Sequence, residues 1–158
     1  MTEQAQLNHA VADLEFTATS GLTAKLADYK GKNIVLYFYP KDSTPGCTIE
    51  SKGFAAQTAN FAASNTVIFG ISRDGMRSHE NFKAKHNMPF ELISDKDETF
   101  CRYFDVIKQK SMFGKKYMGI ERSTFLIDDA GVLRKEWRKV KIRGHVDDVL
   151  QSTATITV

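Results

Sequence analysis

Residues 34–48 read IVLYFYPKDSTPGCT, and this stretch decides the fold. Its first part, residues 34–39, is an uninterrupted run of β-branched, aliphatic and aromatic side chains, which is typical of a strand buried on both faces of a sheet. Thr44 then precedes Pro45, the usual order of an N-cap residue and a proline at the first helical position. We expect a helix from Pro45 to about Ala63, so strand and helix together begin an α/β unit.

The rest of the chain extends this pattern. Residues 67–72 repeat the buried-strand pattern, and a second helix is expected over residues 76–86. The further expected elements are an extended piece at 90–94, a short helix at 97–104, a lysine-rich loop at 108–116, a hairpin of strands 123–127 and 132–137, and a closing helix at 145–150. These units predict an α/β, thioredoxin-like fold, with a central mixed β-sheet and helices on both faces. We expect one domain over residues 1–158, with a core of about 10–150 and a β-prone tail at 151–158 of unknown role.

The composition limits the classes of partner. The chain has 158 residues, 42% of them hydrophobic, and a formal net charge of +3, which is weak for a dedicated nucleic-acid binder. Its longest apolar run, residues 34–39, is far below the roughly 18 residues of a transmembrane helix. The first residues lack the basic and apolar segments of a secretory signal. We therefore expect a cytoplasmic protein that binds neither membrane nor nucleic acid.

The chain has two cysteines, Cys47 and Cys101, too few for a disulfide framework. With Thr44 as N-cap, Cys47 occupies the third helical position, where unpaired backbone N–H groups and the positive end of the helix dipole favour an anion. A thiolate, the nucleophilic form of cysteine, is stabilised there. The alternative is that Cys47 is only a small buried hydrophobic residue. Position alone leaves both interpretations open.

Residues 37–48, YFYPKDSTPGCT, resemble the signature of the peroxiredoxins, in the branch called bacterioferritin comigratory protein or peroxiredoxin Q. Pro40, Thr44 and Cys47 have the spacing of that signature. The resemblance spans about residues 10–150 and continues through GIS at 70–72, LISD at 92–95, RSTFLID at 122–128 and GH at 144–145. It implies a monomeric thiol peroxidase that reduces hydrogen peroxide and organic hydroperoxides in antioxidant defence and redox homeostasis.

The resemblance also implies roles for four residues. Cys47 would be the peroxidatic cysteine, which attacks a hydroperoxide and becomes a sulfenic acid. Arg122 would lie near the thiolate and hold the peroxide oxygens, although without the family it reads as a surface arginine that begins a strand. Thr44 would donate to the thiolate and peroxide, or cap the helix by accepting an N–H. Pro40 would shield the cysteine, or simply end a strand.

The chain departs from the family in its second thiol. Many members carry a resolving cysteine five residues after the peroxidatic one, where this chain has Lys52, and another variant places it near Lys83. Only Cys101 remains, and a disulfide would need the two Cα atoms within about 7 Å of each other. Its aromatic neighbours suggest a half-buried thiol. We favour a one-cysteine cycle with thioredoxin, glutaredoxin or glutathione as the external reductant, and Cys101 remains open as a resolver.

Two other classes are weighed against the peroxidase. A thioredoxin-type dithiol oxidoreductase needs two cysteines separated by two residues, and the position three before Cys47 is Thr44. A noncatalytic module of the same fold, which passes oxidation to a partner protein, remains the alternative. Only the enzyme would consume peroxide catalytically.

The remaining polar features indicate structural roles. His79 and His86 lie seven residues apart on one helix face, and without a third ligand they indicate a solvated or packed face rather than a metal site. His145 is expected to be structural. The basic run at 134–143 alternates like a strand with one solvated face, which we favour over a nucleic-acid patch. We expect neither a metal nor a cofactor.

Overall fold

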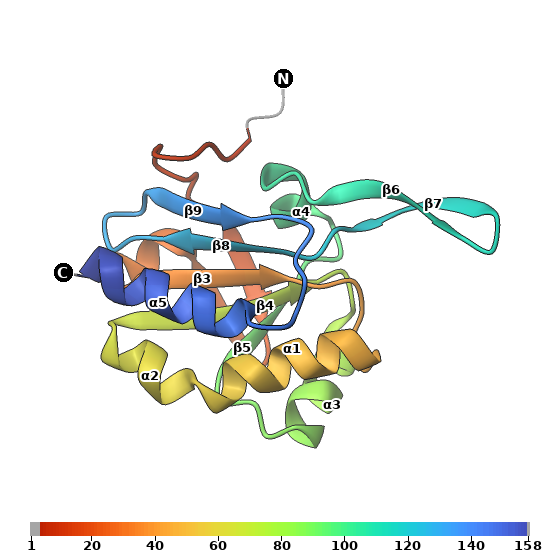
Figure 1. The fold of residues 1–158 in the computed structure, drawn as a ribbon, viewed down its shortest axis with the longest axis horizontal. Helices are drawn as coiled ribbons and strands as arrows, with labels where there is room; N and C mark the ends of the chain where they lie inside the picture. Colours follow the sequence, from red (N-terminus) through yellow and green to blue (C-terminus); the bar gives the residue numbers. More distant parts are fainter. Residues whose placement is uncertain (1–3, 158) are drawn as a thin grey trace.

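The computed structural model describes residues 4–157 and centres on a seven-stranded mixed sheet (Figure 1). The strands follow the spatial order β2-β1-β5-β4-β3-β8-β9. Their bounds are β1 (Glu15–Ala18), β2 (Leu22–Lys25), β3 (Asn33–Phe38), β4 (Thr66–Ser72), β5 (Glu91–Ser94), β8 (Ser123–Ile127) and β9 (Leu133–Trp137). The helices are the 3₁₀ helix η1 (Leu26–Tyr29), α1 (Pro45–Ala56), α2 (Thr58–Ala63), α3 (Met76–Lys85), α4 (Thr99–Tyr103) and α5 (His145–Thr157). No helix among these residues is long and apolar enough to cross a membrane.

Strand β3 lies inside the sheet, as the opening run predicts. All six of its residues are buried, and it pairs parallel with β4 and antiparallel with β8. Strand β5 pairs parallel with β4 and antiparallel with β1, so the sheet is mixed. The expected α/β architecture is confirmed in this respect.

The two faces of the sheet carry two separate apolar clusters. Val35 and Tyr37 of β3 point to one face, where they pack with Cys47 and with residues of α1, α2, α3 and α5. Ile34, Leu36 and Phe38 point to the opposite face, where α4 and its Cys101 complete the other cluster. Figure 1 shows α1 and α4 on opposite sides of the sheet. Because side chains alternate along a strand, the sheet separates the two cysteines.

The helix expected from Pro45 to Ala63 is two helices. Gln57 ends α1 with its backbone N–H directed at the carbonyls of Phe54 and Ala55, a tight turn from which α2 begins. The turn keeps Phe54 and Phe61 together in the core, with ring centroids 5.8 Å apart. Packing of these two rings accompanies the break between α1 and α2, although neither a glycine nor a proline stands at the break.

The lysine-rich loop expected at 108–116 is wrong. Strands β6 (Ile107–Met112) and β7 (Lys115–Ile120) form a two-stranded hairpin, and Phe113 and Gly114 turn it with positive φ angles of 52° and 78°. Two-residue turns with positive φ match the twist of the flanking strands. The strands were missed because most of the hairpin is solvated, so no buried face imposes an alternating pattern.

The basic run is a strand only as far as Trp137, so the expectation of a strand through residue 143 is wrong. Arg138 turns inward instead, donating to the carbonyl oxygens of Phe104 and Asp105 at 2.9 Å each. Lys139 then takes a positive φ of 50°, and the Val140 N–H donates to the Arg122 carbonyl at 3.0 Å. These contacts bend the chain away from the sheet.

The tail also differs from its expected β-prone character, since α5 continues through Thr157. Val149 and Thr153 are buried, and Ile156 packs against the α1 face of the core. Their spacing of four and three residues is helical. Tertiary packing of this stripe therefore outweighs the weak helix propensity of the β-branched residues.

Candidate active site

Cys47 lies in the first turn of α1, as the sequence predicts. Pro45 occupies the first helical position, where no hydrogen-bonding N–H is needed, and Thr44 precedes it with extended backbone angles. The Thr48 N–H closes the first turn on the Thr44 carbonyl at 2.9 Å. Cys47 is only 1% exposed and is a free thiol. The fold thus presents a buried sulfur at the positive end of a helix.

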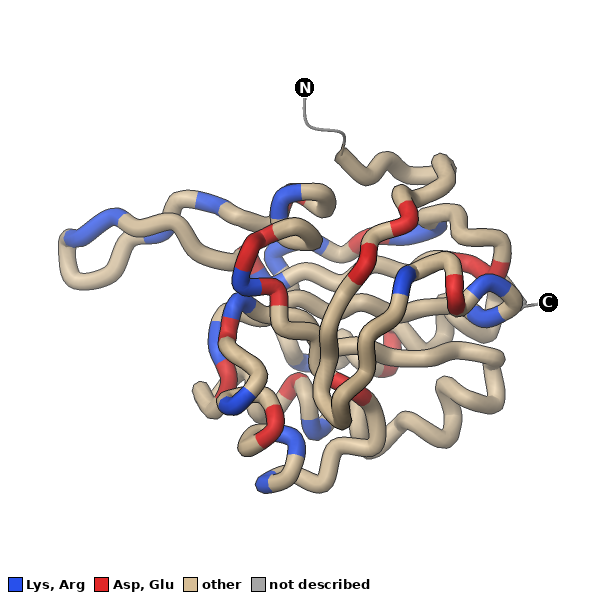
Figure 2. The backbone as a smooth tube through the Cα atoms, turned by 180° about the vertical axis from the view of Figure 1, so that it is seen from behind, with Lys and Arg blue, Asp and Glu red and all other residues tan. Residues whose placement is uncertain are grey.

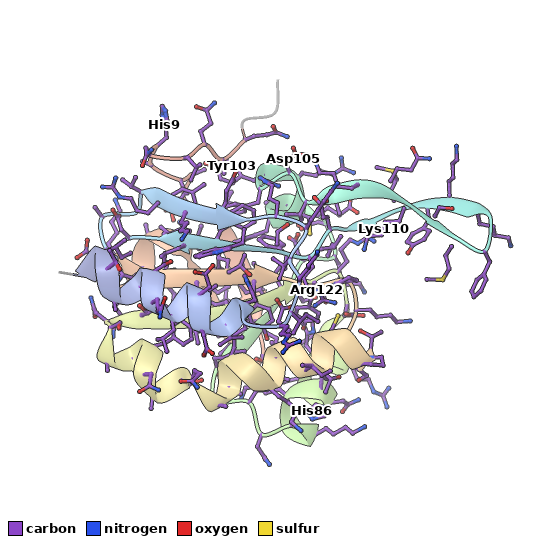
Figure 3. The ribbon with its side chains drawn as sticks, viewed as in Figure 1. His9, His86, Tyr103, Asp105, Lys110 and Arg122 are labelled. Carbon is purple, nitrogen blue, oxygen red and sulfur yellow. The ribbon has the colours of Figure 1, made fainter. Side chains whose placement is uncertain are left out.

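Arg122 reaches this thiol from the segment between β7 and β8 (Figure 3). Its Nη2 lies 3.3 Å from Cys47 Sγ, and its Nη1 lies 2.6 Å from Oε1 of Glu50. Glu50 stands one turn after Cys47 on α1 and is fully buried. One guanidinium therefore contacts both the thiol and a carboxylate.

Gly46 permits the close approach of Arg122. A Cβ atom at this position would lie 3.3 Å from Arg122 Nη2 and 3.3 Å from Cδ1 of Ile142. Both distances are shorter than most contacts of a Cβ atom, so a side chain here would require the guanidinium and Ile142 to shift by a few tenths of an ångström. The glycine of the Pro-Gly-Cys sequence thus serves the Arg122 contact.

Sequence reasoning missed Glu50. The available signal was its spacing of three residues from Cys47, which places both side chains on one helix face. One of its oxygens, Oε2, is buried without a hydrogen-bond partner among residues 4–157. Burial raises the pKa of Glu50 to about 7, although the charge of Arg122 acts in the opposite direction. The site therefore contains a carboxyl that changes charge near neutral pH.

The raised pKa of Glu50 predicts a pH-dependent stability. Between pH 4.5 and about 7 the folded protein holds a proton on Glu50 that the unfolded chain has released. Stability from this group therefore falls as pH rises through that window, by at most about 1.4 kcal/mol per pH unit, and is constant above it. In urea unfolding, we expect Glu50→Gln to gain stability relative to the wild type from pH 4.5 to 7. The exposed Glu15→Gln is the control, and a pH-independent difference for Glu50→Gln would contradict the assignment.

Thr44 and Pro40 frame the loop before Cys47. The Thr44 hydroxyl donates to the Lys41 carbonyl at 2.8 Å and accepts no helix N–H, so the expected side-chain cap is wrong. A carbonyl lies within reach because the loop turns tightly at Ser43, whose φ is 62°. Pro40 is half-buried and lies two residues after the end of β3. The structure brings Cys47 and Arg122 into contact and leaves Thr44 and Pro40 in the adjoining loop.

Asp42 anchors this loop to α3. Its carboxylate accepts from Tyr39 at 2.6 Å and from Ser78 at 2.8 Å, and it lies 2.7 Å from Nδ1 of His79. The other His79 nitrogen lies 2.9 Å from the Ile93 carbonyl. His79 is fully buried and packed, one of the two roles expected for that helix face. Asp42, His79 and Asp74 place possible ligand atoms within 4.8 Å of one another, but hydrogen bonds already engage each of these groups.

Cys101 is fully buried rather than half-buried, because α4 packs it into the cluster on the far side of the sheet. Its backbone N–H donates to Asp95 at 2.8 Å. Burial raises the pKa of the Cys101 thiol, and the neighbouring charge of Asp95 raises it further. Cys101 is therefore a poor nucleophile, and it shares no cluster with Cys47.

His145 has a structural position at the start of α5. Its Nε2 lies 2.7 Å from the Thr124 hydroxyl, and its ring packs edge-on against Phe54. Burial lowers the pKa of His145 to about 4, so it is neutral at pH 7. It joins α5 to β8 and α1.

Comparisons with known proteins agree with this architecture. The AhpC/TSA family model matches residues 7–136. Peroxiredoxin Bcp of Bacillus subtilis is 53% identical over 147 residues, covering 93% of this chain and 94% of that protein. A structure of Xanthomonas campestris Peroxiredoxin Q is 47% identical with a TM-score of 0.88, covering 92% of each chain. A crystal structure of Xylella fastidiosa PrxQ is 35% identical with a TM-score of 0.92, covering 99% of this chain and 100% of that one.

A thioredoxin-like sheet that presents a thiol in the first turn of a helix defines a thiol-dependent oxidoreductase. The chain belongs to the AhpC/TSA family, in the peroxiredoxin Q or bacterioferritin comigratory protein branch, and is a thiol peroxidase. Its substrate is a peroxide and its reductant a thiol. The family expectation is confirmed, and the comparisons favour the enzyme over a noncatalytic redox module.

Proposed function

We propose that Cys47 is the peroxidatic nucleophile and that a thiol from outside the chain completes its cycle. The Cys47 thiolate attacks the terminal oxygen of a hydroperoxide, the O–O bond breaks, and an alcohol or water leaves after taking up a proton. The sulfur loses two electrons and becomes a sulfenic acid. The contact of 3.3 Å between Arg122 Nη2 and Cys47 Sγ carries this proposal, because it supplies a fixed positive charge to the sulfur anion.

The other site residues have supporting roles in the proposal. Arg122 also stabilises the charge that develops on the departing peroxide oxygen. Thr44 offers its hydroxyl to the peroxide once the bond to the Lys41 carbonyl is exchanged, and Pro40 shields the thiol from bulk water. Hydrogen peroxide and organic hydroperoxides are the proposed substrates, in keeping with the alkyl peroxide reduction activity of the Xanthomonas campestris bacterioferritin comigratory protein.

An external thiol is proposed because the second cysteine is unsuitable. Cys101 lies on the other face of the sheet, fully buried, whereas Cys47 lies on the α1 face. An external thiol condenses with the sulfenic acid, forming a mixed disulfide and water. A second thiol then attacks that disulfide, releases the Cys47 thiolate and leaves the reductant as a disulfide. Thioredoxin, glutaredoxin or glutathione supplies these thiols.

The proposed cycle also bears on the cellular compartment and the oligomeric state of the protein. Both cysteines are free, and the cycle needs a supply of reduced thiols, so we place the protein in the cytoplasm. We propose a single-domain monomer, as the family resemblance implies; the contacts that join Cys47, Arg122 and Glu50 form within one chain.

Intact mass after one equivalent of hydrogen peroxide tests the one-cysteine cycle. Without reductant, we expect both wild type and Cys101→Ser to gain one oxygen, because Cys101 does not reach Cys47. With one equivalent of a small thiol also present, both should instead gain the mass of that thiol less two hydrogens, because a mixed disulfide replaces the sulfenic acid. Loss of two hydrogens in the wild type alone would show a Cys47–Cys101 disulfide and overturn the external resolver.

A further inference from the structure

The β6–β7 hairpin projects from the body of the protein as an arm (Figure 1) and forms a sheet of its own. Its outer part exposes large apolar side chains. Phe113 at the tip is 97% exposed, Met112 and Met118 are each 55% exposed, and Tyr117 is 42% exposed. Neighbouring apolar side chains exposed on one element are typical of a surface that contacts another molecule.

The same hairpin is strongly basic. Residues 107–120 contain four lysines and no acidic residue (Figure 2). Lys108 is paired with Asp105 at 3.1 Å, while Lys115 and Lys116 are exposed beside the tip. A partner for this surface must therefore bring negative charge as well as apolar contacts.

The hairpin leads into the active site, because Arg122, whose Nη2 lies 3.3 Å from Cys47 Sγ, follows β7 by two residues. The register pairs Lys110 with Tyr117, and both side chains lie over Gly119, where a Cβ atom would come within 3.3 Å of each. The pKa of Lys110 is lowered, first by burial and then by the charge of Arg122, whereas Cys47 acts in the opposite direction. Lys110 is thus within electrostatic reach of the site (Figure 3).

We propose that this hairpin is the docking surface for the external reductant, an acidic protein dithiol. The inference rests on the proposed external resolver, since Cys47 is nearly buried and a reductant must be held beside it. A protein bound to the face of Lys110 and Tyr117 would lie next to the segment that carries Arg122, whose guanidinium contacts Cys47. A second copy of this chain is a poor occupant, because it carries a net charge of +3 and the same basic hairpin.

The test compares a protein reductant with a small one. The double variant Phe113→Asn/Lys115→Glu removes the apolar tip and reverses one charge. Asn-Gly favours the same positive-φ turn as Phe113-Gly114, so the hairpin should keep its shape. Steady-state peroxide reduction is measured with an acidic thioredoxin, kept reduced by its reductase and NADPH, and separately with dithiothreitol. Lys32→Glu, the same charge change before β3, is the matched control.

We expect kcat/KM for thioredoxin to fall at least about tenfold in the double variant, with rates on dithiothreitol within about twofold of wild type. The wild-type value should also fall with rising salt, and that dependence should weaken in the variant. Lys32→Glu should leave both reductants unaffected. Equal losses with both reductants, or no loss with thioredoxin, would overturn the proposal.

Two outcomes distinguish a failure of the docking proposal from a failure of the proposed one-cysteine cycle. If the wild type turns over with dithiothreitol or glutathione but not with thioredoxin, the docking proposal is wrong and the external thiol stands. If peroxide drives a Cys47–Cys101 disulfide, the proposed cycle itself is wrong. Sedimentation of wild type, but not the variant, with anionic phospholipid vesicles, alongside an unchanged thioredoxin rate, would assign the hairpin to a membrane surface and overturn the inference.

Discussion

Replacing Cys47 with serine is expected to lower peroxide reduction by at least about 10³-fold, because the reacting atom itself is removed. A serine hydroxyl is not ionised at neutral pH, and its oxygen cannot take the peroxide oxygen as sulfur does. Helix α1 should remain folded, since the two side chains differ by one atom. Stopped-flow peroxide consumption, with dithiothreitol as reductant, measures the effect.

Cys101→Ser is the matched control for this experiment. It makes the same atomic change at another fully buried cysteine, so it reproduces the cost of placing a hydroxyl in the core without touching the site. We expect it to lower stability while the peroxide rate stays within about twofold of wild type. If Cys47→Ser retained turnover, or Cys101→Ser abolished it in folded protein, the assignment of the nucleophile would be wrong.

The sequence predicted the centre of the fold because its strands are buried on both faces. After Asn33, strand β3 contains only β-branched, aliphatic and aromatic residues in a run too short for a typical helix, which favours a strand, and Pro45 marks the start of α1. The hairpin β6–β7 was missed because it has no buried face to set a period. The last turns of α5 were missed because the β-branched residues of the tail have a local preference for strands. The burial of Thr153 in the core outweighs that preference and makes the tail helical.

The candidate site was predictable in its motif and not in its tertiary partners. The motif placed Cys47 in the first turn, and the resemblance assigned Arg122, which the structure sets against the thiol. Glu50 was missed because a carboxylate on a helix normally faces solvent, and only the fold shows Arg122 over it. The Asp42–His79 contact was also missed, because its partners lie 37 residues apart in the sequence and only the fold brings them together.

Arg122→Met is expected to lower the rate of the peroxide step by about 10²–10³-fold, the usual effect of removing one charged or hydrogen-bonding group from a reacting centre. Methionine fills much of the same volume but offers no charge to the Cys47 sulfur. Arg122→Lys should lose less, because an ammonium keeps the charge yet cannot contact sulfur and Glu50 through one planar fork. Stopped-flow rates with hydrogen peroxide rank the three proteins.

Loss of Arg122 also leaves Glu50 buried without its partner, and this second effect must be separated from the first. Without Arg122 the pKa of Glu50 rises further, because the guanidinium no longer favours the carboxylate. At a pH above that pKa, an ionised Glu50 would repel a thiolate on the same helix face and would destabilise the fold by about 3 kcal/mol. The double variant Arg122→Met/Glu50→Gln removes that charge. If the guanidinium acts directly, the double variant recovers stability in urea unfolding but stays as slow as Arg122→Met. Recovery of the peroxide rate would instead show that Arg122 acts only by neutralising Glu50.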